Sequence, residues 1–93
     1  MDNAEMLTAL KIDLGISTTN AYDVRLVEYL GSARAAIIRE GITLTDSLED
    51  CDLVVDYAGW LWNKRRTGEA IPRSLRWRLN NRLLSEKMSG GEA

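Results

Sequence analysis

The fold of this chain is decided by residues 48–66, LEDCDLVVDYAGWLWNKRR. Apolar side chains recur there at helical spacing and spread over more than one side of the predicted helix. They are Cys51, Leu53, Val54, Val55, Tyr57, Ala58, Trp60, Leu61 and Trp62. A helix that is apolar over most of its circumference is buried on several sides. We therefore predict that 48–66 is the central helix of the fold and that Cys51 is a buried, reduced thiol.

Polar residues mark both ends of this central helix. Ser47, followed three residues later by Asp50, resembles a capping signature. The preceding run 42–46, ITLTD, alternates over too few residues for a strand, so we expect a loop there. At the other end, the basic residues 64–66 complement the negative end of the helix dipole, and Gly68 can adopt the left-handed conformation that stops a helix.

Three further helices fit the apolar spacing on either side. We predict helices over 4–14 and 21–40, with the linker 17–20 supplying side-chain oxygens that cap the second. Pro72 suits the first turn of a fourth helix, because its missing N–H would be unpaired there anyway. A narrow apolar ridge runs along that helix and consists of Leu75, Leu79 and Leu83. The predicted fold class is all-α, a small bundle of about four helices around the apolar third helix.

The length of 93 residues indicates one domain. We expect a single helical domain over 1–86. From Ser85 onward the residues are small and polar, so we expect the helix to fray there and 87–93 to form a flexible tail.

The composition gives little support to catalysis. The chain has no histidine and one cysteine, so neither a histidine base nor a zinc or iron site is expected. Neither a P-loop nor a dinucleotide fingerprint occurs. The acids that open the central helix are typical of a solvated helix start; they are Glu49, Asp50, Asp52 and Asp56. We expect no enzymatic activity, no cofactor and no metal. We also expect no secretory signal, because the N-terminus is acidic and amphipathic, and no membrane association, because no apolar run approaches the ~18 residues of a membrane span.

Residues 57–84 join an aromatic segment directly to a cationic one. Seven of the twelve basic residues lie between Lys64 and Arg82, against a single acid, Glu69, and 57–84 also holds all three tryptophans. Trp and Arg dominate binding hot spots, so this composition favours a recognition surface. The candidate contact residues are Lys64, Arg65, Arg66, Arg73, Arg76, Trp77, Arg78 and Arg82.

The three tryptophans have different expected roles. Trp60 and Trp62 share helical spacing with Tyr57 inside an apolar segment, which favours a place in the core. Trp77 stands between two arginines and off the leucine ridge. We expect it to be exposed in the monomer and buried against a partner.

The charge is divided along the chain. Residues 1–63 carry eleven acids and four bases, whereas 64–93 carry three acids and eight bases. This asymmetry fits a head-to-tail contact between identical subunits, in which acidic faces of the second and third helices meet the basic C-terminal third of the next copy. It also fits an acidic partner for the C-terminal third alone, or phosphate binding by the arginines. The overall acidic charge favours a protein partner.

The order of these features resembles the small head-tail connector (adaptor) proteins of long-tailed phages, siphophages, that infect Gram-positive bacteria. The resemblance covers about 7–86, and its most specific part is YAGWLWNKRRTGE (57–69) followed by IPRSLRWRLNNRLL (71–84). It implies that residues of this segment support the junction of the third and fourth helices and its contacts with other subunits. Those residues are Tyr57, Trp60, Lys64, Arg65, Arg66, Pro72, Leu75, Arg76, Trp77 and Asn80.

The resemblance also implies the partners. The subunit would assemble in the host cytoplasm into a ring, with twelvefold symmetry to match the portal protein, at the head-tail interface of the virion. The ring would extend the DNA channel, without sequence-specific DNA binding, and present a surface to the next connector or tail-completion protein. The alternative from a different class is a small phage-encoded nucleic-acid-binding regulator of the helix-turn-helix kind.

Overall fold

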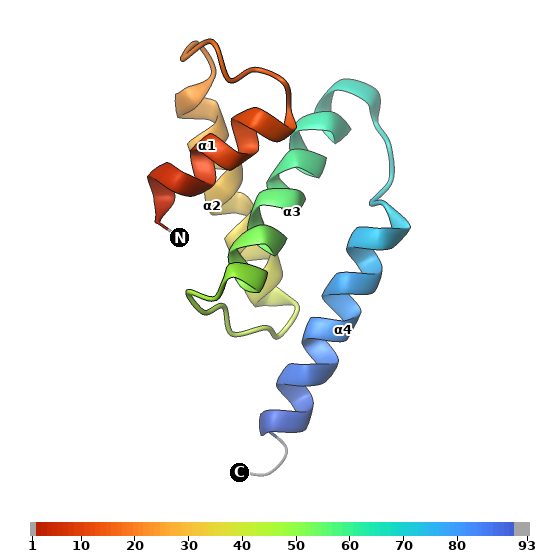
Figure 1. Cartoon of the computed structure of the whole chain (residues 1–93). Helices are drawn as coiled ribbons and strands as arrows, with labels where there is room; N and C mark the ends of the chain where they lie inside the picture. Colours follow the sequence, from red (N-terminus) through yellow and green to blue (C-terminus); the bar gives the residue numbers. More distant parts are fainter. Residues whose placement is uncertain (1, 91–93) are drawn as a thin grey trace.

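The computed structural model describes residues 2–90 and consists of four helices joined by short loops (Figure 1). The helices are α1 (Asn3–Asp13), α2 (Asp23–Arg39), α3 (Leu48–Thr67) and α4 (Arg73–Gly90). No strand occurs in the described residues, and 42–45 is a loop, as the sequence predicts. The predicted all-α fold class is confirmed. None of these helices has the length and apolar character that a bilayer crossing requires.

Helix α3 is the centre of the bundle, because it packs against each of the other three helices. It begins where Ser47 accepts a hydrogen bond from the backbone N–H of Asp50, so the predicted cap is confirmed. It ends at Gly68, whose φ of 71° lies in the left-handed region that favours glycine. Both ends of the central helix are therefore set by local sequence.

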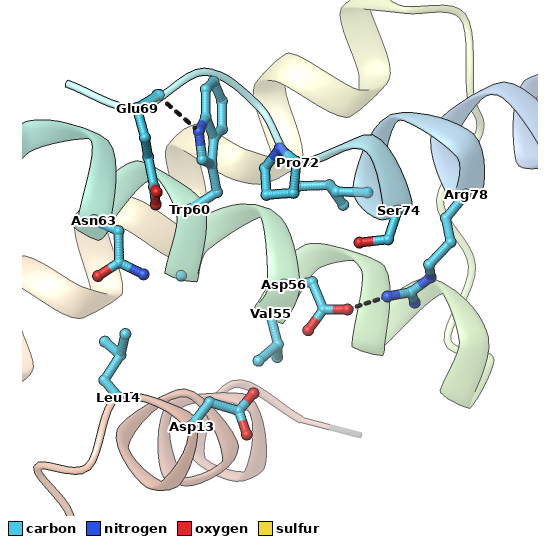
Figure 2. Close-up of a pocket in the computed structure, with 12 residues that line it drawn as sticks. Asp13, Leu14, Val55, Asp56, Trp60, Asn63, Glu69, Pro72, Ser74 and Arg78 are labelled. Atoms are coloured by element: carbon cyan, nitrogen blue, oxygen red, sulfur yellow. Dashed lines mark hydrogen bonds and ion pairs between the residues drawn. The ribbon is translucent and has the colours of Figure 1, made fainter. Parts of the chain in front are cut away.

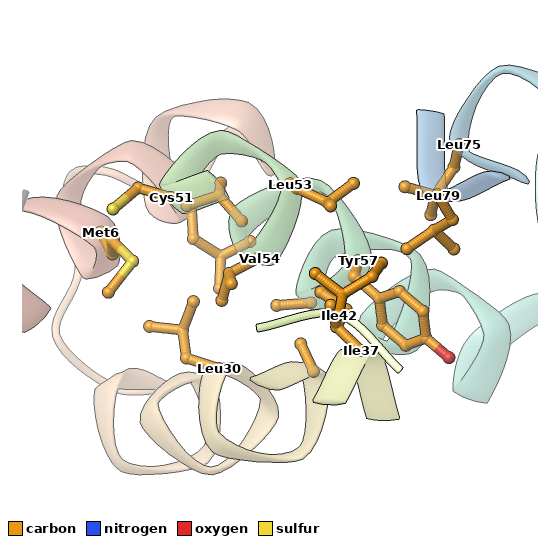
Figure 3. Close-up of a cluster of buried hydrophobic side chains, with 14 of the residues drawn as sticks. Met6, Leu30, Ile37, Ile42, Cys51, Leu53, Val54, Tyr57, Leu75 and Leu79 are labelled. Atoms are coloured by element: carbon orange, nitrogen blue, oxygen red, sulfur yellow. The ribbon is translucent and has the colours of Figure 1, made fainter. Parts of the chain in front are cut away.

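The hydrophobic core collects around α3 (Figure 3). Met6 of α1 and Cys51 lie toward one end of the buried cluster, whereas Leu75 and Leu79 of α4 lie at the other. Cys51 is buried, as predicted. The remaining buried apolar residues are Leu10, Leu26, Leu30, Ala33, Ile37, Ile42, Leu53, Val54, Val55, Tyr57 and Ala58.

The start of α2 differs from the sequence prediction. The linker 17–20 does not cap this helix; Tyr22 occupies the N-cap position and makes no side-chain capping bond. Lys11 of α1 is the reason, because its buried ammonium donates to Asn20 Oδ1 at 2.9 Å and lies 3.0 Å from Asp23 Oδ1. The side-chain oxygen of Asn20 thus binds Lys11 of α1 and does not cap α2.

The end of α4 also differs. The expectation that the helix frays from Ser85 onward is wrong for 85–90, because α4 continues to Gly90. Glu86 explains part of this extension: its carboxylate accepts the backbone N–H of Thr43 and lies 3.8 Å from Arg82. Residues 85–90 have a weak preference for helix by themselves, and the contact of Glu86 with Thr43 therefore helps to keep them helical. Residues 91–93, the last part of the predicted tail, lie outside the described residues.

Candidate protein interface

Arg82 fastens α4 to the start of α3. Its Nε donates to Asp50 Oδ1 at 2.8 Å, and its Nη2 donates to the carbonyl of Thr43 at 2.7 Å. The Asp50 side chain is only 3% exposed. Burial raises the pKa of Asp50, but hydrogen bonds from Arg82 and Thr45 outweigh this and hold the pKa below its ordinary value. Arg82 thus neutralises a buried carboxylate of its own chain.

Two more arginines of α4 pair with acids of the same molecule. Arg76 lies 2.9 Å from Glu40, the residue that closes α2. Arg78 reaches Asp56 on α3, as Figure 2 shows. The charge pattern made Glu40 and Asp56 candidates for contact with a neighbouring subunit, but in the structure they pair with arginines of their own chain. The role of Arg76, Arg78 and Arg82 in a contact with another molecule stays a prediction.

A cavity of about 350 Å³ lies between α1, α3, the connection to α4 and the start of α4. Figure 2 shows the side chains that line it. Trp60 lies on its wall and donates from its indole nitrogen to the carbonyl of Glu69 at 3.3 Å, which ties the connection to α3. Asp13 faces the same space; burial raises its pKa, and the nearby charges of Asp56 and Asp52 raise it further. Within the described residues no three metal-ligating side chains are grouped to hold a cation.

The outer face of α4 is apolar as well. Trp77 is 68% exposed, as predicted, and it shares one helix face with Leu84 and Met88, which are 56% and 65% exposed. On the opposite side of the helix, Leu75 and Leu79 are buried against α3. We call Trp77, Leu84 and Met88 the outer face of α4. Because Leu75 and Leu79 already pack inside the molecule, the outer face of α4 is the apolar side that is free to contact another molecule.

The other candidate residues lie near this face or at the end of α3. Arg73 opens α4, is exposed and makes no ion pair with the described residues. Lys64 lies over the Trp60 ring, with 5.0 Å between its ammonium and the ring centroid. Arg66 lies over the Trp62 ring at 5.8 Å, and Arg65 donates to the Tyr29 hydroxyl at 3.2 Å. The helix-end cations therefore contact aromatic groups instead of carboxylates.

Arg65 and Arg66 border a pocket that the sequence does not reveal. It has a volume of about 500 Å³ and lies where the end of α3 meets the start of α2. Trp62 forms its aromatic wall with two tyrosines, making edge-to-face contacts with Tyr22 at 5.3 Å and Tyr29 at 6.2 Å between ring centroids. We call it the aromatic pocket; its lining residues are Ala21, Tyr22, Arg25, Tyr29, Trp62, Arg65 and Arg66. The signal in the sequence was the spacing of Tyr22, Arg25 and Tyr29, which places them on one face of a helix.

Comparison with known protein families, with curated proteins and with solved structures gives no match for this chain.

Proposed function

We propose that this chain is a structural subunit of a phage head-tail connector. The observation that carries the proposal is the outer face of α4, because three large apolar side chains are exposed there on a helix whose other side is already buried. Tryptophan, which this face contributes as Trp77, is among the residue types that most often anchor a protein contact. The resemblance of 57–84 to connector proteins supplies the kind of assembly.

In this assembly the subunits form a ring, of twelvefold symmetry, beneath the portal protein. The outer face of α4 meets the portal or the neighbouring subunit, and the ring docks the next connector or tail-completion protein. DNA passes through the channel without sequence-specific contacts. No catalysis is required of the subunit.

The arginine pairs favour this function over a nucleic-acid-binding regulator. An arginine that already pairs with a carboxylate has to give up that pair before it can neutralise a phosphate. Arg76, Arg78 and Arg82 each face a carboxylate of the same chain. Helix α4 therefore offers an apolar surface to a partner more readily than a cationic one.

The test is binding to the portal encoded in the same genome, measured by native mass spectrometry. We expect a stable complex, and we expect Trp77→Ser to weaken it about tenfold or more, as loss of a hot-spot residue does. The matched control is Val24→Ser, which removes another exposed apolar side chain, 80% exposed, from α2. No complex with the portal, or equal weakening by both variants, would contradict the proposal. Retention of the chain on DNA at moderate salt would favour the regulator instead.

A further inference from the structure

The aromatic pocket has a cationic rim of three arginines, two of which have no carboxylate partner in the described part of the chain. Arg65 and Arg66 make no ion pair within the described residues, and their contacts are the Tyr29 hydroxyl and the Trp62 ring. Arg25 pairs only with Glu28, over 3.3 Å, and both of these side chains are more than half exposed. Exposed pairs of this kind are weak and exchange readily with other partners. The pocket therefore fits a group with an apolar body and negative charge around it.

A group of that description lies at the opposite end of α3. Leu48, the first residue of α3, is 66% exposed. Three exposed acids, Asp46, Glu49 and Asp52, lie within four positions of Leu48 along the chain, and none of them makes a salt bridge within the described residues. We call Asp46, Leu48, Glu49 and Asp52 the Leu48 turn. The Leu48 turn presents one aliphatic side chain and three carboxylates. The aromatic pocket presents three aromatic rings and three arginines.

We propose that the aromatic pocket receives the Leu48 turn of a second copy of this chain. The two sites lie at the two ends of one helix of 20 residues, which spans about 30 Å, so a molecule cannot fill its own pocket. The contact is therefore intermolecular and joins two different patches, which makes it heterologous. A chain of such contacts keeps one unfilled pocket at one end and one unused Leu48 turn at the other, and a suitable rotation between copies brings these two together and closes the chain into a ring.

This inference rests on the proposed function for its self-assembly, but the contact that it names is separate from the outer face of α4. The charge complementarity acts through exposed groups, so added salt weakens the contact. Burial of Leu48 against the three rings supplies the apolar part, which salt does not weaken.

The experiment uses two variants that each remove one side of the contact. Leu48→Asp keeps the aromatic pocket and loses the aliphatic side chain, whereas the double variant Arg65→Glu, Arg66→Glu loses the cationic rim and keeps the Leu48 turn. Neither substituted side chain is buried, so both variants are expected to fold. When the two variants are mixed, the aromatic pocket of Leu48→Asp can bind the Leu48 turn of the double variant, but no assembly larger than this pair can form.

The readout is the indole N–H signal of Trp62 in 15N-labelled Leu48→Asp protein, assigned with Trp62→Phe. Unlabelled double variant is added to about 1 mM, a concentration at which even a weak contact with a Kd near 1 mM is half-formed. We expect the Trp62 signal to move and the Trp77 signal to stay. As control, the unlabelled triple variant Leu48→Asp, Arg65→Glu, Arg66→Glu moves neither. A second test is charge exchange, read on the Trp62 signal of 15N-labelled double variant, because that signal reports only the pocket that carries the glutamates. We expect this signal to move when Glu49→Arg, Asp52→Arg protein is added.

An unmoved Trp62 signal in the mixture, or an equal shift with the triple variant, overturns the inference. The outcome is distinguishable from failure of the proposed function. If the wild-type chain binds the portal while the mixture gives no Trp62 shift, the inference fails and the proposed function stands. If the mixture responds and no portal complex forms, the self-contact stands and the connector function fails.

Discussion

Arg82 on α4 and Asp50 in the first turn of α3 form a buried polar contact between the fourth helix and the body of the protein, with 2.8 Å between Nε and Oδ1. Asp50 also accepts the backbone N–H and the hydroxyl of Thr45, each at 2.8 Å. One carboxylate therefore fixes both the loop before α3 and the helix that packs beside it. The apolar ridge of Leu75 and Leu79 completes the attachment of α4.

Removal of the Arg82 charge is expected to destabilise the protein strongly. Arg82→Met leaves the Asp50 carboxylate buried without a cation, and breaking a buried pair in this way costs about 3–5 kcal/mol. The measurement is the free energy of unfolding in urea at pH 7. Arg25→Met is the control, because it breaks an exposed pair and is expected to cost at most about 0.5 kcal/mol. Equal costs for the two variants would show that the Arg82 pair contributes no more than a surface pair.

The stability of the protein is expected to depend on pH through Asp50. The pKa of this carboxyl is lower in the folded protein than its ordinary value of 3.8. Its contribution is therefore fully present above that value and is lost as the pH falls through the lower folded pKa. Asp50→Asn lacks this contribution, so the free energies of unfolding of wild type and variant should differ most near neutral pH and converge in acid. A constant difference between pH 7 and pH 2 would contradict this assignment.

Asp13 is expected to have the opposite effect. Its pKa is raised above the ordinary value of 3.8 by burial and by the charges of Asp56 and Asp52. A raised carboxyl pKa means that ionisation opposes folding, so the cost is present above the folded pKa and disappears as the pH falls below 3.8. Asp13→Asn should therefore raise the melting temperature at pH 7 and leave it unchanged in strong acid. A gain that is the same at both pH values would point to a cause other than charge.

Trp77 is expected to matter little for the stability of the monomer. Because its side chain is 68% exposed, Trp77→Ala should change the free energy of unfolding by no more than about 0.5 kcal/mol. Leu79→Ala, two residues along the same helix, removes a fully buried side chain and should cost about 2–5 kcal/mol. Urea unfolding of both variants tests the contrast. A large loss for Trp77→Ala would assign Trp77 a role in the monomer core.

Two glycines are expected to respond in opposite directions to alanine. Gly31 lies inside α2 with no atom within 4 Å of an added Cβ, so Gly31→Ala should stabilise the protein by about 0.5–1 kcal/mol. Gly68 also has open space around it, but its φ is 71°, and alanine there should cost about 1–2 kcal/mol. Thermal unfolding of the two variants gives the signs. Stabilisation by Gly68→Ala would mean that the end of α3 can adopt another backbone conformation.

The helices themselves could be predicted because their signals are local. The apolar spacing of 48–66, the cap at Ser47 and the stop at Gly68 act over a few residues, and the structure confirms each of them. The exposure of Trp77 could also be predicted, since it follows from the position of one residue relative to a leucine ridge. The prediction from local spacing was wrong at the start of α2. There Lys11, nine residues before Asn20, binds the Asn20 side-chain oxygen that was expected to cap the helix.

The candidate interface was harder to predict because the sequence does not show which acidic residue each arginine contacts. A run of arginines between 73 and 82 indicates contact with acids, but the sequence does not say whether those acids belong to the same molecule. The pairs of Arg82 with Asp50 and of Arg78 with Asp56 join residues more than twenty positions apart. The aromatic pocket likewise needs Tyr22 and Trp62, which come together only when α2 and α3 pack.

The amino-acid order thus specifies four helices, a central third helix and an exposed Trp77, because helix formation and amphipathic spacing depend on neighbours a few positions away. Packing of the helices adds the rest. It pairs Arg76, Arg78 and Arg82 with carboxylates of the same chain, and it leaves Arg65 and Arg66 at the edge of an aromatic pocket. The physical reason is that ion pairs and ring contacts form between groups brought together in space, and distance along the chain does not fix distance in the fold.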